Sequence, residues 1–289
     1  MQRGGEFMTI AMTKQEGNPG GSTGNMDIAC EADEYVGEDG LVYCSTCHTP
    51  RQTRKMLFGK ERILSVLCRC RQEERDRLEE ERRQREFRQE ISRMKADGLQ
   101  DKALYDYCFE KDRKENPQMR HAYTYVDRWE EMWEKGRGLL IWGPVGSGKS
   151  FMAGCIANAL LDRRIRVLAT NFSKILNSLT GMFGEDRNTY INGFNHYALL
   201  IIDDLGIERK TDFALEQIFN VIDSRYRSKK PMIVCTNLEL DELRNPPDLE
   251  HERIYDRILE RCIPIRSCNR NFRTENAMRN MREAAEIFV

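Results

Sequence analysis

The most constraining feature of this sequence is a glycine-rich stretch between two apolar segments, residues 138–154 (GLLIWGPVGSGKSFMAG). Glycine loses more conformational entropy on folding than other residues, so its three glycines after Trp142 are costly unless something must approach the backbone closely. The apolar run before them predicts a buried strand over 139–142, and the run after them predicts a helix over 151–161. A phosphate group is the usual ligand of such a loop between a strand and a helix.

The spacing within this stretch is that of a P-loop: Gly143, four residues, then Gly148, Lys149 and Ser150. The amide groups of such a loop surround an anion at a helix N-terminus, where the backbone dipole already favours negative charge. We expect Lys149 to reach the β- and γ-phosphates of a nucleotide and Ser150 to place its hydroxyl on magnesium. A chance glycine turn is the alternative, because short patterns of this kind also occur without function.

A second apolar run, residues 198–202, ends in Asp203 and Asp204. A central parallel strand delivers carboxylates to the phosphate edge of a sheet in this way. We expect Asp203 to hold the magnesium shell and Asp204 to act as a general base or to orient water. The side chain of Asp204 is one methylene shorter than that of glutamate, which predicts slow hydrolysis. The alternative is an acidic pair that caps the next helix.

Two further segments carry polar side chains suited to a phosphate site. The predicted strand PMIVCTNL ends in Asn237, whose amide is able to orient water against a γ-phosphate, although a single asparagine is also a common turn residue. The helical segment HERIYDRILERC places Arg253, Arg257 and Arg261 on one face. Such a stripe is usually a solvated face, unless a neighbouring subunit brings phosphate to it.

Composition limits the function classes. With 40% hydrophobic and 32% charged residues, part of the chain is expected to be poorly buried. A net charge of −1 does not indicate a globally basic nucleic-acid binder, so a DNA contact would need a local patch. The chain has no run of eighteen apolar residues and no signal-peptide core, so we expect a cytoplasmic protein without a membrane partner.

The chain divides by composition into four stretches. The third stretch, residues 71–99, is mostly charged and has opposite charges four residues apart, which predicts a solvated helix. Only Phe87, Ile91 and Met94 form an apolar end that is ready to dock. A spacer is favoured over a coiled coil because no heptad is sustained. The stretches are a disordered leader (1–27), a zinc-binding module (28–70), a charged helical linker (71–99) and a globular domain (100–289).

The ten cysteines of a chain in a reducing compartment indicate metal binding rather than disulfides. Cys44 and Cys47 have the two-residue gap that lets two thiolates bind one tetrahedral zinc, and Cys68 and Cys70 follow after a loop and could close the site. Scattered buried cysteines are the alternative. Two neighbours that remain alternative ligands are Cys30 and His48. The cysteines interpreted as apolar core residues are Cys108, Cys155, Cys235, Cys262 and Cys268.

Taken together, these motifs resemble a known family. The segments GPVGSGKS, LLIIDDLG, NFSKILNSL, ALEQIFNVIDSRYRSKKP, IVCTNL and RIYDRILERC are similar to those of AAA+ ATPases of the DnaC type, which are bacterial and phage helicase loaders. The IstB-type transposition ATPases share most of these motifs. The resemblance covers roughly residues 115–273, and the cysteine segment is similar, more weakly, to the N-terminal zinc region of phage-borne loaders.

The resemblance implies an α/β fold, in which an AAA+ P-loop NTPase core has a parallel sheet sandwiched by helices and a reduced C-terminal lid. Residues 100–289 would form this ATPase domain, after the small zinc-binding module and the charged linker. The implied function is ATP-dependent loading of a replicative ring helicase of the DnaB type, with slow ATP hydrolysis, binding of single-stranded DNA and ATP-dependent homo-oligomerisation. The alternative is a transposition helper of the IstB type, acting with a transposase.

The resemblance also implies roles for individual residues. Asn237 matches sensor 1, Arg253 looks like the arginine finger with Arg257 in the same box, and Arg273 sits near the place of sensor 2, followed by enough chain for one helix. The catalytic residues would be Asp204, Asn237, Arg253 and Arg257. The nucleotide contacts would be Gly143, Pro144, Val145, Gly146, Ser147, Gly148, Lys149, Ser150, Phe151, Asp203 and Arg273. The metal ligands would be Cys44, Cys47, Cys68 and Cys70 for zinc, with Ser150 and Asp203 for magnesium.

One segment is a candidate for contact with single-stranded DNA. Residues 171–197 lie between the second and third predicted strands, where initiator-type relatives carry an extra helix that touches DNA. Phe172 would supply stacking and Lys174 a phosphate contact. Packing of Phe172 in the core is the alternative.

Overall fold

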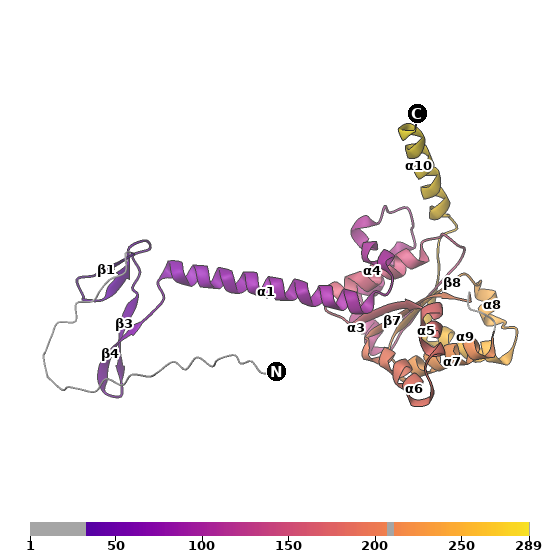
Figure 1. Ribbon diagram of the computed structural model, residues 1–289, viewed down its shortest axis with the longest axis horizontal. Helices are drawn as coiled ribbons and strands as arrows, with labels where there is room; N and C mark the ends of the chain where they lie inside the picture. The colour runs from indigo at the N-terminus through magenta and orange to yellow at the C-terminus, as the bar shows by residue number, and fades with distance from the viewer. Residues whose placement is uncertain (1–32, 207–210, 289) are drawn as a thin grey trace, which may run out of the picture. The chain divides into compact units, whose positions relative to one another are not determined.

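The computed structural model describes residues 33–206 and 211–288. The expected leader, 1–27, and the alternative ligand Cys30 therefore lie outside the described residues. The chain forms two compact units, Met1–Glu81 and Arg82–Val289, and each is described here by itself (Figure 1). The division between the two units falls inside a helix.

The described strands of the first unit form two small antiparallel ribbons. One pairs β1 (Glu34–Val36) with β2 (Val42–Cys44), and the other pairs β3 (Gln52–Leu57) with β4 (Lys60–Ser65). Among its described residues, the buried apolar side chains are Val42, Cys44 and Cys68. So small a core does not stabilise a fold of this size by burial alone, which points to a metal or another cross-link.

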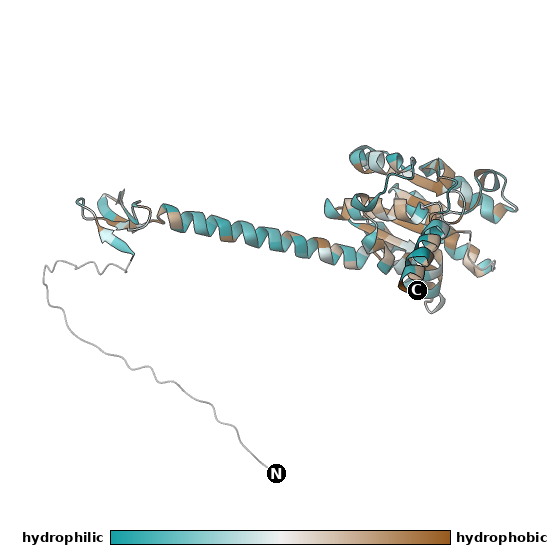
Figure 2. Cartoon of the chain, turned by 90° about the horizontal axis from the view of Figure 1, so that it is seen from above, coloured by the Kyte–Doolittle hydropathy of each residue, from teal (hydrophilic) through white to brown (hydrophobic). Residues whose placement is uncertain are grey.

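Helix α1 (Arg69–Gly98) begins in the first unit and ends in the second. Most of its length is hydrophilic (Figure 2), and ion pairs one turn apart line it, such as Arg75–Glu79 at 3.9 Å. Near its end, Met94 packs against the core of the second unit and Gly98 is buried. A Cβ on Gly98 would lie 2.0 Å from the carbonyl oxygen of Val167, so only glycine lets the last turn approach this backbone.

The second unit is built on a parallel sheet of five strands in the order β6-β7-β8-β5-β9. Parallel strands covered on both faces need nearly continuous apolar sequence, and the apolar residues of the three central strands are buried except for Trp142 at the end of β5, which is half-buried. This confirms the predicted α/β fold and its parallel sheet. The strands are β5 (Gly138–Trp142), β6 (Val167–Asn171), β7 (Leu199–Leu205), β8 (Met232–Thr236) and β9 (Cys262–Arg266).

Helices cover both faces of this sheet. On one face α2 and α4 pack with the end of α1, and on the other α5, α7 and α9 form a second apolar cluster. Among the residues with described positions, no helix is both long enough and apolar enough to cross a membrane. The α-helices are α2 (Met119–Asp127), α3 (Trp129–Glu134), α4 (Lys149–Asp162), α5 (Phe172–Thr180), α6 (Gly184–Gly193), α7 (Asp212–Arg227), α8 (Leu240–Arg244), α9 (Leu249–Arg261) and α10 (Phe272–Ile287); the short 3₁₀ turns are η1 (Lys102–Asp106), η2 (Phe109–Lys111) and η3 (Phe194–His196).

The candidate DNA-contacting segment forms α5 and α6. Phe172, at the start of α5, is 1% exposed and belongs to the second apolar cluster. The stacking role suggested for Phe172 is therefore wrong, and the alternative of core packing is confirmed, because a ring buried this deeply cannot reach a base. The amine of Lys174 donates a hydrogen bond to the carbonyl oxygen of Gln100 at 2.6 Å.

Candidate functional site

The glycine-rich loop joins β5 to α4, which begins at Lys149. Gly143, Gly146 and Gly148 have φ values of 133°, 78° and 87°, in the region that residues with a Cβ rarely adopt. A Cβ on Gly146 would also lie 2.1 Å from the side-chain oxygen of Asn271. Both the conformation of the loop and the closeness of its neighbours therefore require these glycines.

Lys149 is the centre of a hydrogen-bond network at this edge of the sheet. Its amine donates to the carbonyl oxygens of Gly143 at 2.9 Å and Pro144 at 2.8 Å, and to the side-chain oxygen of Asn237 at 2.7 Å. The fold thus brings together two residues, 88 positions apart, that the sequence selected separately. Burial lowers the pKa of Lys149, because removal from water disfavours the charged amine.

The two acidic residues follow the buried part of β7. The amide of Asp204 donates to a carboxylate oxygen of Asp203 at 3.0 Å, and Asp204 has a φ of 62°. The pairing of β7 with β8 shifts register between Ile202 and Leu205, so the strand bulges at the acidic pair. Asp204 is exposed at the pocket, but partial desolvation of its carboxyl and the neighbouring charge of Asp203 raise its pKa. Carboxylate and hydroxyl oxygens are ligands that magnesium prefers, so Asp203, Asp204 and Ser150 are chemically suited to hold it.

A pocket of about 480 Å³ lies against the P-loop. Five parts of the sequence line it: the segment 107–119, the P-loop, Asp204 of β7, Asn237 after β8, and α10. Arg273 is among the lining residues. The lining residues used below are Tyr107, Asn116, Ser147, Lys149, Ser150, Asp204, Asn237, Phe272 and Arg273.

Two segments beside the P-loop carry no motif that marks them in the sequence: the residues from the end of β9 to Phe272, and the residues before α2. In the segment after β9, the hydroxyls of Ser267 and Ser147 are 2.6 Å apart and the amide of Phe272 donates to the Gly146 carbonyl at 2.9 Å. Before α2, the ring of Tyr107 lies edge-on to that of Phe151, with centroids 5.4 Å apart. No local pattern marks these residues. The available signal was topological: β9 runs parallel to β5, so the residues after both strands reach the same edge.

Arg253 and Arg257, two of the three arginines of α9, differ in their surroundings. Arg257 donates to a carboxylate oxygen of Asp223 at 2.9 Å, and its guanidinium lies 4.8 Å from the ring centre of Phe219, so it is held within its own chain. Arg253 is exposed, and its carbonyl accepts a hydrogen bond from Arg257 at 2.7 Å. Within the described part of the chain, neither arginine lines the P-loop pocket.

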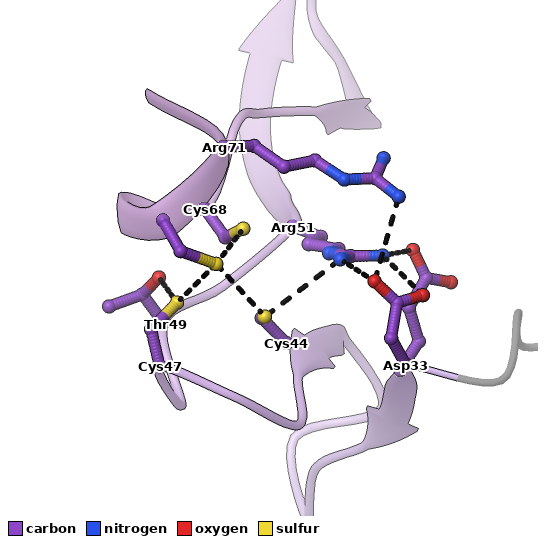
Figure 3. A network of polar contacts seen from close by, with 9 residues as sticks. Asp33, Cys44, Cys47, Thr49, Arg51, Cys68 and Arg71 are labelled. Atoms are coloured by element: carbon purple, nitrogen blue, oxygen red, sulfur yellow. Dashed lines mark hydrogen bonds and ion pairs between the residues drawn. The ribbon is translucent and has the colours of Figure 1, made fainter. Parts of the chain in front are cut away.

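The first unit holds a compact group of four sulfur atoms (Figure 3), from Cys44, Cys47, Cys68 and Cys70, all within 4.8 Å of one another. The sulfur of Cys70 lies 3.4–3.5 Å from the other three. Sulfur atoms around a tetrahedral zinc with bonds of about 2.3 Å lie about 3.8 Å apart. The four thiols therefore fit a closed zinc site. His48 is outside this group, and its ring lies against that of Tyr35.

Polar groups surround the four sulfurs (Figure 3). The hydroxyl of Thr49 lies 3.0 Å from the sulfur of Cys47 and is the main cause that lowers the pKa of that thiol to about 5. The buried guanidinium of Arg51 lies 3.8 Å from the sulfur of Cys44 and pairs with Asp33 at 2.6 Å and with Glu34. Such outer groups favour thiolates over thiols and orient them toward a metal.

Comparison with known proteins agrees with this architecture. A family model described as IstB-like ATP binding protein matches residues 71–280. The replicative helicase loader DnaC of Escherichia coli (strain K12) is 28% identical over 160 residues, which is 54% of this chain and 64% of DnaC. The replicative helicase loader DnaI of Bacillus subtilis (strain 168) is 27% identical over 168 residues, 53% of each chain.

A solved structure described as the crystal structure of the DnaI has the same fold, with a TM-score of 0.50 and 19% identity, over 60% of this chain and 94% of that one. The chain spans 64% of the length of DnaC and 53% of that of the curated DnaI. The match of the family model extends over most of the sequence, from the charged helix to α10. The chain therefore belongs to the family of IstB-like ATP-binding proteins, with the AAA+ core that its DnaC-type motifs predicted.

Proposed function

We propose that this protein is an ATP-dependent loader of a replicative ring helicase of the DnaB type, and that it hydrolyses ATP slowly. The observation that carries the proposal is the meeting of Lys149, Asn237 and Asp204 at one pocket beside the P-loop. A lysine, an amide and a carboxylate around a phosphate-sized loop are the groups that phosphoryl transfer requires. The similarity to two replicative helicase loaders supports the choice of partner.

Each group in the pocket has a separate task in this proposal. The P-loop amides bind the phosphates, and Lys149 turns from the carbonyls of Gly143 and Pro144 toward the β- and γ-oxygens. Magnesium, held by Ser150 and Asp203, would neutralise phosphate charge. Asp204 accepts the proton of the attacking water, and the amide of Asn237 orients that water.

Two arginines complete the proposed ATPase site from different subunits. Arg273 contacts the phosphates within its own chain, from the first turn of α10. Arg253 is exposed and outside its own pocket, which suits an arginine finger that enters the pocket of a neighbouring subunit in an ATP-dependent homo-oligomer. Arg257 is proposed to act indirectly, since its pairing with Asp223 fixes α9 and so orients Arg253.

We further propose a division of labour between the parts of the chain. The four cysteines of the zinc-binding module (28–70) would hold a structural zinc, and this module would grip the helicase. The charged linker (71–99) would tether it to the ATPase domain (100–289), which would engage single-stranded DNA. This division is supported by the separate cores of the two compact units.

The decisive experiment is co-elution with a replicative ring helicase, with and without ATP. Lys149→Ala should abolish ATP-dependent assembly and ATP turnover, yet leave helicase binding intact, because the binding module lies elsewhere in the chain. Lys135→Ala is the matched control, since Lys135 is an exposed lysine on the second unit that pairs with Glu131. Loss of helicase binding together with ATP binding in Lys149→Ala would contradict the division of labour.

The second candidate function is a transposition helper of the IstB type, which would bind a transposase and duplex DNA. This candidate is supported by the matching family model, which is described as IstB-like ATP binding protein. Parallel pull-downs with a ring helicase and a transposase as bait separate the two. Retention by the transposase alone would assign the protein to transposition.

A further inference from the structure

The turn of the β3–β4 ribbon carries a residue that the fold of the ribbon does not favour. Phe58 and Gly59 form a two-residue turn with φ values of 52° and 73°. Such turns prefer asparagine, aspartate or glycine at the first position, and a bulky residue there is a strained outlier. The Phe58 side chain is also fully exposed, at 104% of its reference area. Neither backbone preference nor burial explains a phenylalanine at this position.

One face of the same ribbon is basic. The register places Lys55 opposite Arg62 and Leu57 opposite Lys60, and directly opposed residues point to the same side of a ribbon. Lys55, Lys60 and Arg62 therefore share one side, which we call the basic face. Like charges directly opposite each other destabilise a strand pair. Within the residues that the structure covers, none of the three pairs with a carboxylate.

The opposite face does not have this bias. There Arg54 lies opposite Ile63, and Met56 lies opposite Glu61, so a single positive charge is balanced by a single negative one. Lysines on an exposed ribbon also hinder edge-to-edge aggregation, which is one reason to find them here. An exposed phenylalanine at the tip promotes aggregation instead. The combination of a one-sided basic face and an aromatic tip is therefore the feature to be explained.

We propose that this ribbon binds single-stranded nucleic acid. Lys55, Lys60 and Arg62 contact successive phosphates along the basic face, and the ring of Phe58 stacks on an unpaired base at the tip. Phosphate contacts supply affinity without sequence preference, and aromatic stacking adds to it because every base has a π-face. Nucleic-acid binding then explains why the chain keeps both the strained backbone at Phe58 and the opposed charges of Lys55 and Arg62. This contact is separate from the ATPase unit and does not rest on the proposed loading function.

The basic face is tested by the salt dependence of binding. Fluorescence anisotropy would follow a labelled oligothymidylate with the full, zinc-loaded chain, without nucleotide. The triple variant Lys55→Gln, Lys60→Gln and Arg62→Gln should lower the slope of log K against log salt by about 2, since each single-strand phosphate contact contributes about 0.7. Arg54→Gln, next to Lys55 but on the opposite face, should leave the slope unchanged. Equal slopes for the wild type and the triple variant would overturn the proposal.

The tip is tested separately, with variants that keep the ribbon folded. Phe58→Ala should weaken binding by about 5- to 150-fold, the range typical for loss of one stacked base, and Phe58→Tyr should retain affinity. Phe58→Asn suits the turn better, so it should weaken binding while the zinc content stays at one equivalent and thermal stability is kept or raised. Duplex DNA of the same length should bind more weakly than the single strand. Unchanged affinity in Phe58→Asn, or equal affinity for duplex, would refute stacking at the tip.

A third comparison separates this contact from the proposed loading function. In Lys149→Ala, ATP-dependent assembly should be lost while the effects of the ribbon variants on DNA binding persist. Failure of helicase co-elution in the wild type would refute the loading function and leave the ribbon proposal unaffected. If the ribbon variants lose helicase binding but keep wild-type DNA affinity, the basic face serves a protein partner and the present proposal is wrong.

Discussion

At the scale of single residues, Asp204 combines two unfavourable features. Its backbone is in the left-handed region, with a φ of 62°, and partial desolvation and Asp203 together raise the pKa of its carboxyl. Strain and perturbed titration in one residue are typical of functional sites, where the surrounding fold enforces a geometry that the residue alone would avoid. Such a residue is expected to lower stability in exchange for activity.

Asp204→Asn should therefore stabilise the protein at pH 7 while lowering ATP turnover at least about 10-fold. Because the pKa of Asp204 is raised in the folded state, its charged carboxylate reduces the stability of the protein at pH values above that pKa. This destabilisation disappears as the pH falls through the folded-state pKa toward the ordinary value of 3.8. The gain in Tm should accordingly shrink toward pH 4. Asparagine tolerates a positive φ, so the backbone is preserved. Thermal unfolding from pH 4 to 7, with turnover assays, checks both effects, and a lower Tm at pH 7 would count against this account.

At the scale of elements, the sequence predicted the strands of the AAA+ core well and the contacts between distant elements poorly. β5, β7 and β8 are apolar runs that end in glycine or polar residues, and each lies where the pattern indicated. The sequence alone leaves two roles open for Phe172, base stacking and core packing, because its burial depends on distant elements such as α7 and α9 that leave no local trace. The contacts of Ser267 and Tyr107 could not be predicted either, because their partners at or beside the P-loop are far away in sequence.

The junction between α1 and the sheet gives a prediction at this scale. In Gly98→Ala the new Cβ would meet the backbone oxygen of Val167 at 2.0 Å, so the last turn of α1 must move away from β6. The move should also weaken the pairing of Lys95 with Asp162, now 2.8 Å, and reduce stability by at least about 1 kcal/mol, as overpacking commonly does. Urea unfolding measures the change. Gly193→Ala is the control, since a Cβ there meets nothing within 4 Å, and equal stability of the two variants would argue against a close fit of α1.

At the scale of the whole molecule, the two units differ in what stabilises them. The second unit buries extensive apolar clusters on both faces of its sheet, whereas the first unit buries Val42, Cys44 and Cys68 among its described apolar residues. If the four cysteines hold zinc as proposed, a unit with so small a core should depend on it, because zinc binding in small modules contributes directly to folding.

Removal of zinc should therefore unfold one unit and spare the other. With zinc bound, calorimetry should show a separate transition for the first unit, and a strong chelator should abolish it while the transition of the second unit keeps its Tm. Cys47→Ser should behave like the chelated protein, whereas Cys155→Ser, which changes a buried cysteine of α4, should lower the Tm of the second unit only. Freshly purified protein with less than about half an equivalent of zinc would speak against the site.

The anchoring of the P-loop by the chain after β9 bears on how this protein can be cut into expression fragments. A fragment ending at Arg266 would keep every residue of the glycine-rich motif, the acidic pair and Asn237. It would lose the Ser267 hydroxyl beside Ser147, the Phe272 amide on the Gly146 carbonyl, and the Asn271 side chain that abuts Gly146. Residues 82–266 should consequently bind ATP more weakly in calorimetric titration than residues 82–289, although an inspection of motifs would judge the shorter piece intact.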